Sequence, residues 1–291
     1  MDVNLESVLD GLVNVSTGFV HSDELVVSWN KRNFSKTMET LAGVFSDWVN
    51  ANEFHFHCQG DGSASTFWDF KIWNELFPNE SEVPRETHAN LIHNIQPDAK
   101  IVVIFRNPTD RLYSDYYYIN RGQNISPMMF HRCSIEAITI FNNCLQNHKL
   151  RTCAYSKKKN VSMRKKDVGL SLNDDEKTLS KCPNVRLNVG LYDVFTQDWL
   201  NVFPRDQLFF MTTEDWNSNC VEYLKRIYMF LGLDIQSDDD RRKVCQNEHA
   251  NTGKKKPPML DESRELLDEF YRPHMRILSN LLNHTKYSWN L

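Results

Sequence analysis

Residues 100–120 constrain the fold more than any other stretch of the sequence. They open with an unbroken apolar run rich in β-branched residues, from Ile101 to Phe105, which predicts a buried strand. Asn107 and Pro108 then turn the chain, so Pro108 can occupy the first turn of a following helix. The stretch therefore predicts a strand, a tight turn and a helix in direct succession.

Other segments repeat this alternation of strand and helix. Further strands are predicted at residues 53–58 and 207–211. Helical spacing of apolar residues predicts helices at 35–49, 134–148, 188–203, 220–233 and 264–283. Strands separated by helices predict a three-layer α/β domain with a mainly parallel sheet. A polar, lysine-rich stretch at about 156–183 predicts a surface insertion.

Charged and hydroxyl side chains gather just after the central strand. Arg106 stands at the strand's exit, and Arg111 and Ser114, three residues apart, share a face of the following helix. Two guanidinium groups and a hydroxyl at the carboxyl end of a strand form a convergent site for a phosphate. The alternative is a buried strand followed by an amphipathic helix whose arginines are merely solvated.

The spacing Arg106-x4-Arg111-x2-Ser114-x-Tyr116 resembles the 3′-phosphate-binding motif of sulfotransferases that use 3′-phosphoadenosine 5′-phosphosulfate. The run FRNPTDRLYSDYYY is similar to the matching segment of carbohydrate sulfotransferases. This resemblance extends roughly from residue 58 to the end of the sequence. It implies that Arg106, Ser114 and Arg111 hold the 3′-phosphate of the nucleotide.

The resemblance also implies a P-loop-like fold, with a domain at 58–291 and an N-terminal remnant at 1–57 packed on it. The family's phosphosulfate loop, Lys-x-Gly-Thr-Thr, does not occur in this sequence, and neither does its Lys-Glu-Pro-His segment. In the family that loop wraps the 5′-phosphosulfate with backbone N–H groups, and the glutamate serves as general base. We therefore expect the fold to lack its first strand and loop.

Several further residues are assigned by the same resemblance. Lys254 and Lys255 match, in position and charge, a basic loop that closes over the nucleotide. Asp61 is the candidate general base, although it lies outside the family's base motif.

The segment 63–69 resembles the family segment beside the sulfuryl group and the acceptor sugar. Ser63 and Ser65 can donate to a phosphate or sugar oxygen, and Trp68 can stack on a sugar face. The alternative is a serine-capped helix start with a tryptophan in the core.

The function implied is transfer of a sulfuryl group from 3′-phosphoadenosine 5′-phosphosulfate to a hydroxyl of a sulfated N-acetylgalactosamine glycan of the chondroitin or dermatan sulfate type. The alternative is an inactive sulfotransferase-like protein that binds a sulfated glycan or the nucleotide. The family's enzymes reside in the Golgi, so we expect a luminal or membrane location there, with any membrane anchor outside this sequence. Met1 to Asp10 carries no signal peptide pattern.

The composition, with 41% hydrophobic and 25% charged residues, is ordinary for a globular protein. The formal net charge of −4 excludes a generally basic nucleic-acid binder. The seven cysteines include no C-x2-C pair, which argues against a structural zinc site, and His55 and His57 lack a third ligand nearby. We therefore predict no metal. Six N-x-S/T sequons and a plausible Cys144–Cys153 disulfide favour an oxidising compartment.

Overall fold

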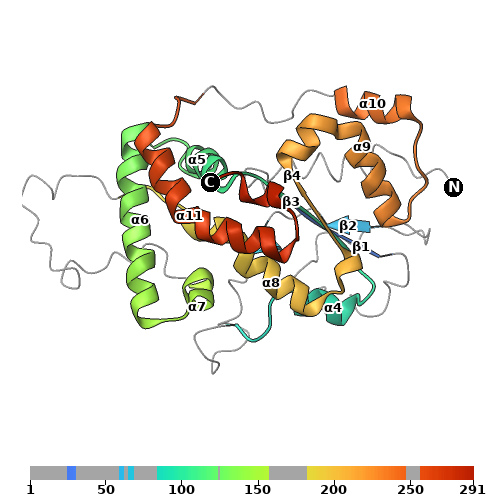
Figure 1. The fold of residues 1–291 in the computed structure, drawn as a ribbon, viewed down its shortest axis with the longest axis horizontal. Coiled ribbons are helices and arrows are strands. Elements are labelled where there is room, and N and C mark those ends of the chain that lie inside the picture. The colour runs from blue at the N-terminus through green and yellow to red at the C-terminus, as the bar shows by residue number, and fades with distance from the viewer. Residues whose placement is uncertain are drawn as a thin grey trace, which may run out of the picture.

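The computed structural model describes residues 25–30, 59–61, 65–68, 84–123, 125–156, 182–246 and 256–291. Within these residues four strands form one sheet in the order β2-β1-β3-β4 (Figure 1). The strands are β1 Leu25–Asn30, β2 Gln59–Asp61, β3 Lys100–Phe105 and β4 Leu208–Thr212. The strands predicted near residues 100 and 207 are confirmed, whereas the one at 53–58 lies outside the described residues.

The described sheet is mixed. β3 and β4 pair in parallel, with Val103 opposite Phe210, as expected of an α/β domain. β1 runs antiparallel to β3 and also to β2, where Ser28 is opposite Asp61. The sheet differs from the expected mainly parallel one because β1, within the predicted N-terminal remnant, enters it between β2 and β3 in the opposite direction.

Eight α-helices and three short 3-10 helices are described. The α-helices are α4 His88–Ile95, α5 Pro108–Ile119, α6 Pro127–Asn147, α7 Leu150–Tyr155, α8 Tyr192–Val202, α9 Thr213–Leu231, α10 Asp238–Gln246 and α11 Asp261–Leu281. The 3-10 helices are η2 Leu187–Gly190, η3 Arg205–Gln207 and η4 Thr285–Ser288. The predicted helix at 35–49 and residues 157–181 of the predicted insertion lie outside this description.

Local capping explains where two helices begin. α6 starts seven residues earlier than expected because the Ser126 side chain accepts a hydrogen bond from the Met129 amide and Pro127 fits the first turn. α9 starts directly after β4 with a capping box between Thr212 and Asp215, and Gly232 ends it in the left-handed conformation.

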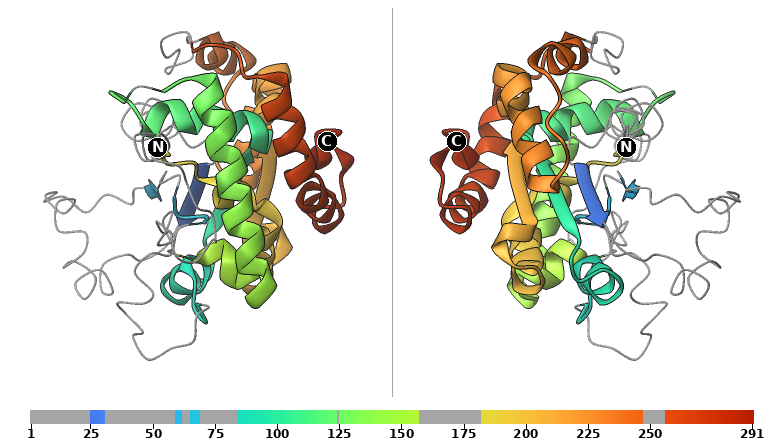
Figure 2. Two further views of the ribbon diagram at one scale, coloured as in Figure 1. Left: turned by 90° about the vertical axis from the view of Figure 1, so that its left-hand side faces the viewer. Right: turned by 90° about the vertical axis from the view of Figure 1, so that its right-hand side faces the viewer.

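The strand β3 separates two hydrophobic layers. Ile101, Val103 and Phe105 are fully buried in a core that also contains residues of α5, α6, α8 and α11. Val102 points to the other face, where Met211 and the α9 residue Ile227 complete a smaller core. Figures 1 and 2 show the same division, with α5, α6 and α11 on one side of β3 and β4 and α9 on the other. The fold is therefore helix, sheet, helix, as the sequence predicts.

Three disulfides link the described helices and loops. They join Cys133 to Cys182, Cys144 to Cys153, and Cys220 to Cys245. The predicted Cys144–Cys153 pairing is confirmed, and it ties the end of α6 to α7. Within the described part of the chain, no helix is long and apolar enough to cross a membrane.

Candidate functional site

The turn between β3 and α5 is fixed by Asn107. Its side-chain oxygen accepts hydrogen bonds from the amides of Thr109 at 3.0 Å and Asp110 at 3.1 Å, and Pro108 has no amide hydrogen to satisfy. The amides at the helix start are therefore occupied by the cap. Any phosphate bound here must be held mainly by side chains.

Arg106 and Ser114, two of the predicted phosphate ligands, lie on either side of this turn. Arg106 directly follows β3 and is half-buried, and its backbone carbonyl accepts a hydrogen bond from the hydroxyl of Tyr192 at 3.0 Å. Ser114 is half-buried two turns into α5, and its hydroxyl makes no hydrogen bond with the described residues. The predicted pair thus lies on one strand-to-helix unit. Hydrogen bonds from Tyr192 to the Arg106 carbonyl and from the α5 amides to the Asn107 side chain fix the turn in this unit.

Arg111, the third predicted phosphate ligand, lies inside the protein. Its side chain is fully buried, with Nη1 3.5 Å from Asp115 and Nη2 donating to the carbonyl of Arg186 at 3.1 Å. A buried guanidinium held by a carboxylate and a carbonyl is a structural group rather than an open anion site. The structure therefore favours a supporting role for Arg111 over direct contact with phosphate.

Asp115 and Arg186 were not anticipated from the sequence as part of this site. Arg186 donates to both carboxylate oxygens of Asp115, from Nε at 2.7 Å and from Nη2. The same guanidinium lies over the ring of Trp68, 5.4 Å from its centroid. The i,i+4 spacing of Arg111 and Asp115 was a signal of pairing in the sequence, whereas Arg186 lies 71 residues further along and gave none.

The predicted acceptor segment is described only at residues 65–68. Ser65 and Trp68 are half-buried, and the Trp68 amide donates to the Ser65 carbonyl at 3.2 Å. The indole of Trp199 donates to the Phe67 carbonyl at 3.0 Å, and Phe67 packs in the core. This turn is therefore attached to α8. The predicted residue Ser63 lies outside the described residues, and only the backbone pairing of Asp61 in β2 is described.

The basic loop is described from residue 256 onward, so Lys254 and Lys255 lie outside the described residues. The hydroxyl of Tyr113 on α5 donates to the carbonyls of Pro257 at 2.8 Å and Pro258 at 3.1 Å. The ammonium of Lys256 lies 5.2 Å from the centroid of the Tyr113 ring. Burial, followed by the neighbouring Tyr117, raises the pKa of Tyr113, so it stays a protonated donor.

Two contacts join the first turn of α5 to α11. The hydroxyl of Thr109 donates to Asp268 at 2.6 Å, and Arg264 forms an ion pair with Asp110 at 2.6 Å. These contacts fix the first turn of α5, next to Arg106. No group of three or more His, Cys, Asp or Glu side chains that can hold a metal ion occurs among the described residues.

Comparison with known proteins gives a consistent result. A family model described as a sulfotransferase domain matches residues 30–258. Carbohydrate sulfotransferase 15 of Mus musculus is 32% identical over 235 residues, covering 79% of this chain and 38% of that protein. Bifunctional heparan sulfate N-deacetylase/N-sulfotransferase 2 of Bos taurus is 27% identical over 237 residues, covering 76% of this chain and 22% of that protein.

Among solved structures, a sulfotransferase from Alicyclobacillus acidocaldarius superposes with a TM-score of 0.43 at 18% identity, covering 77% of this chain and 74% of that one. The chain spans well under half the length of the mouse and bovine relatives. The family match covers the strand-to-helix unit of Arg106 and Ser114 and most of the chain on either side. The chain therefore belongs to the sulfotransferase family.

Proposed function

We propose that the chain binds 3′-phosphoadenosine 5′-phosphosulfate and transfers its sulfuryl group to a hydroxyl of a sulfated N-acetylgalactosamine glycan of the chondroitin or dermatan sulfate type. The observation that carries the proposal is the placement of Arg106 at the end of β3 and Ser114 two turns into α5. The relatives' names, which include a carbohydrate sulfotransferase and a heparan sulfate N-sulfotransferase, support a glycan acceptor.

In this proposal Arg106 and Ser114 bind the 3′-phosphate of the nucleotide. Arg106 supplies a charge-assisted contact and Ser114 a hydroxyl donor. The buried Arg111 acts indirectly, because its contacts with Asp115 and the Arg186 carbonyl hold α5 in place. Lys254 and Lys255, just before the Lys256 and Tyr113 contact, are proposed to add positive charge over the nucleotide.

The acceptor is proposed to lie against the segment 63–68. There the indole of Trp68 offers a face for a sugar ring, and Ser63 and Ser65 offer hydroxyl groups. In the reaction the sugar oxygen attacks sulfur in line, the bond from sulfur to the 5′-phosphate oxygen breaks, and the sugar proton passes to a base. Asp61 is the base that we propose. The products are a sulfated glycan and 3′-phosphoadenosine 5′-phosphate.

A second candidate function follows from the sequence. It contains no Lys-x-Gly-Thr-Thr loop, the segment whose backbone donors and lysine stabilise the leaving phosphate in the family. Loss of one such donor commonly costs about 100-fold to 1000-fold in rate. A protein with the 3′-phosphate site alone binds the nucleotide or a sulfated glycan without transfer, since that site acts mainly on binding. Residence in the Golgi is proposed for both candidates.

Transfer of radiolabelled sulfate to chondroitin 4-sulfate decides between these two functions. The assay compares the 291-residue chain with a version extended at its N-terminus by the phosphosulfate loop of a relative. We expect weak transfer from the 291-residue chain and strong transfer from the extended version, because the loop acts on the transition state. Full transfer by the chain alone would establish the enzyme and assign the missing stabilisation to its own residues. No transfer by either version, with nucleotide binding intact, would favour the binding protein.

A further inference from the structure

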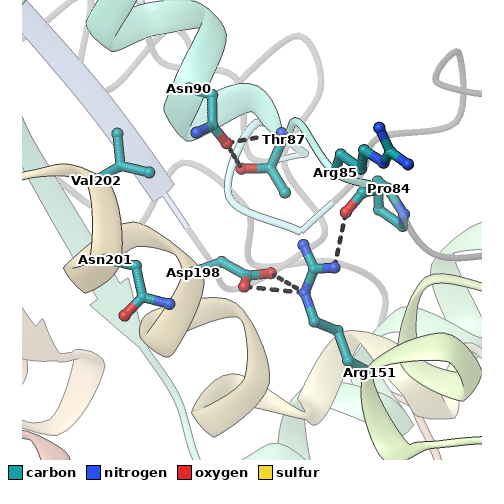
Figure 3. A pocket seen from close by; sticks show the side chains of 8 residues that line it. All are labelled: Pro84, Arg85, Thr87, Asn90, Arg151, Asp198, Asn201 and Val202. Carbon is teal, nitrogen blue, oxygen red and sulfur yellow. Dashed lines mark hydrogen bonds and ion pairs between the residues drawn. The ribbon is translucent and has the colours of Figure 1, made fainter. Parts of the chain in front are cut away.

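A surface pocket of about 460 Å³ is lined by residues of α4, α7 and α8 and of the segment that precedes α4 (Figure 3). Its lining includes Asn90 of α4, Arg151 of α7, and Asp198 and Asn201 of α8. None of these residues was singled out by the sequence or used in the proposed function. Their hydrogen bonds decide what the pocket can hold.

Hydrogen bonds hold the guanidinium of Arg151 in the lining of the pocket. Its Nε donates to both oxygens of Asp198 at 3.0 Å, and its Nη1 donates to the carbonyl of Pro84 at 2.7 Å. Asp198 also accepts from the hydroxyl of Tyr155 at 2.8 Å. Burial, followed by the Asp198 carboxylate, raises the pKa of Tyr155, so this hydroxyl stays a donor. The oxygens of Asp198 and Pro84 are therefore satisfied within the protein.

The amide oxygens of the lining are also in use. The side-chain oxygen of Asn90 accepts from the amide of Thr87 at 2.9 Å and from its hydroxyl at 3.0 Å. The side-chain oxygen of Asn201 accepts from the amide of the Gln197 side chain at 2.8 Å. In both asparagines the Oδ1 atom thus accepts a hydrogen bond from a neighbouring residue, whereas the Nδ2 group remains as a possible donor to a ligand.

What the lining offers to a ligand is therefore a set of donors. Within the described structure, Nη2 of Arg151 and Nδ2 of Asn90 and Asn201 donate no hydrogen bond. Figure 3 shows Nη2 on the side of the Arg151 guanidinium that faces Thr87. The Arg151 side chain is 33% exposed, so a ligand can reach it. A fixed guanidinium with amide donors nearby suits an oxyanion, because little side-chain freedom is lost on binding.

We propose that this pocket is a second anion site, which binds a sulfate or carboxylate group of the acceptor glycan at a distance from the point of transfer. The identity of the glycan rests on the proposed function. One helix connects the two places: Tyr192 at the start of α8 contacts Arg106, and Asn201 follows nine residues later. At 1.5 Å per residue this is about 14 Å along the helix. A charged glycan chain that reaches both places gains affinity from the second contact.

The test introduces one negative charge into the pocket. Asn201→Asp replaces the Nδ2 donor with a carboxylate oxygen, and Asn142→Asp, on the exposed face of α6, is the same chemical change outside the pocket. Isothermal titration measures the binding of a chondroitin 4-sulfate octasaccharide and of a chemically desulfated chondroitin octasaccharide, which keeps its carboxylates. Titration with 3′-phosphoadenosine 5′-phosphate reports on the nucleotide site in the same variants.

We expect Asn201→Asp to weaken binding of the sulfated octasaccharide at least fivefold, and Asn142→Asp to change it less than twofold. An equal fold loss with the desulfated octasaccharide identifies the bound group as a carboxylate, and a smaller one identifies it as a sulfate. Equal affinities of the two variants would overturn the proposal, as would a wild-type chain that binds neither octasaccharide. Nucleotide binding should be unchanged in both variants. Failure of the nucleotide site would instead appear as a wild-type chain that does not bind 3′-phosphoadenosine 5′-phosphate.

Discussion

The guanidinium of Arg186 donates hydrogen bonds from two nitrogens to the carboxylate of Asp115. The same guanidinium lies over the ring of Trp68, 5.4 Å from the ring centroid. Asp115 belongs to α5, which carries the proposed phosphate ligand Ser114, whereas Trp68 belongs to the proposed acceptor segment. One side chain therefore joins the two halves of the proposed site. Fully buried Arg111 completes the network beneath it.

Asp115→Asn should strongly destabilise the protein. The substitution leaves the buried guanidinium of Arg111 without its carboxylate and removes the pair with Arg186. Breaking a buried ion pair by removing one partner typically costs about 3 to 5 kcal/mol. Urea denaturation followed by circular dichroism measures the free energy of unfolding. Asp239→Asn, which breaks an exposed pair with Arg242, is the matched control and should leave the midpoint unchanged. Equal midpoints for the two variants would contradict a structural role for the Asp115 network.

The disulfides should differ in their contribution to stability. Cys144–Cys153 spans 9 residues and Cys133–Cys182 spans 49, so the longer closure restricts the unfolded chain more. The chain-entropy relation gives about 2.6 kcal/mol for the shorter loop and about 4.1 kcal/mol for the longer one. Replacing each pair with serines and comparing urea unfolding tests this order. A larger loss from the Cys144 and Cys153 pair would show that native packing, not loop length, dominates.

The contribution of the Lys286–Asp215 ion pair should depend on pH. Burial opposes ionisation of Asp215, but hydrogen bonds from Lys286 and the Thr212 amide outweigh it and lower the pKa of this carboxyl. A carboxyl whose folded pKa is depressed stabilises the fold above its unfolded pKa of about 3.9, and this contribution is lost as the pH falls through the folded value.

Lys286→Met should therefore lower the melting temperature near neutral pH and have progressively less effect in acid. The expected loss at about pH 7 is on the order of 1 kcal/mol, since both side chains are partly exposed. Melting curves of the wild type and the variant are compared from about pH 7 down to about pH 3. A difference that stays constant over this range would show that Lys286 acts by packing rather than by charge.

Local signals in the sequence were enough to predict the centre of the fold. The apolar run at 101–105 and the Asn107-Pro108 turn predicted β3 and the start of α5 correctly, because both features depend on neighbouring residues. The start of α6 was predicted too late, although Ser126-Pro127 is a local capping signal. The strand β1 was missed, since its place between β2 and β3 depends on partners far along the chain.

In the candidate site, too, the features that depend on neighbouring residues could be predicted, and those that depend on residues far along the chain could not. The Arg106 to Ser114 spacing could be read from the sequence, because one strand and one helix position both residues. The burial of Arg111 could not, since it depends on the Arg186 carbonyl, 75 residues away. The pocket proposed to bind an anion was also beyond sequence reasoning, because Asn90, Arg151 and Asn201 come from three separate helices that only the folded core brings together.

Nucleotide selectivity tests the central claim most directly. Isothermal titration compares 3′-phosphoadenosine 5′-phosphate with adenosine 5′-phosphate, on the wild type and on Arg106→Ala. We expect the wild type to prefer the 3′-phosphorylated nucleotide strongly and Arg106→Ala to lose about 2 to 4 kcal/mol of that binding, the scale of a lost charge-assisted contact. Binding of adenosine 5′-phosphate should change little. Equal affinity of the wild type for the two nucleotides would contradict the assignment of Arg106 and Ser114 to the 3′-phosphate.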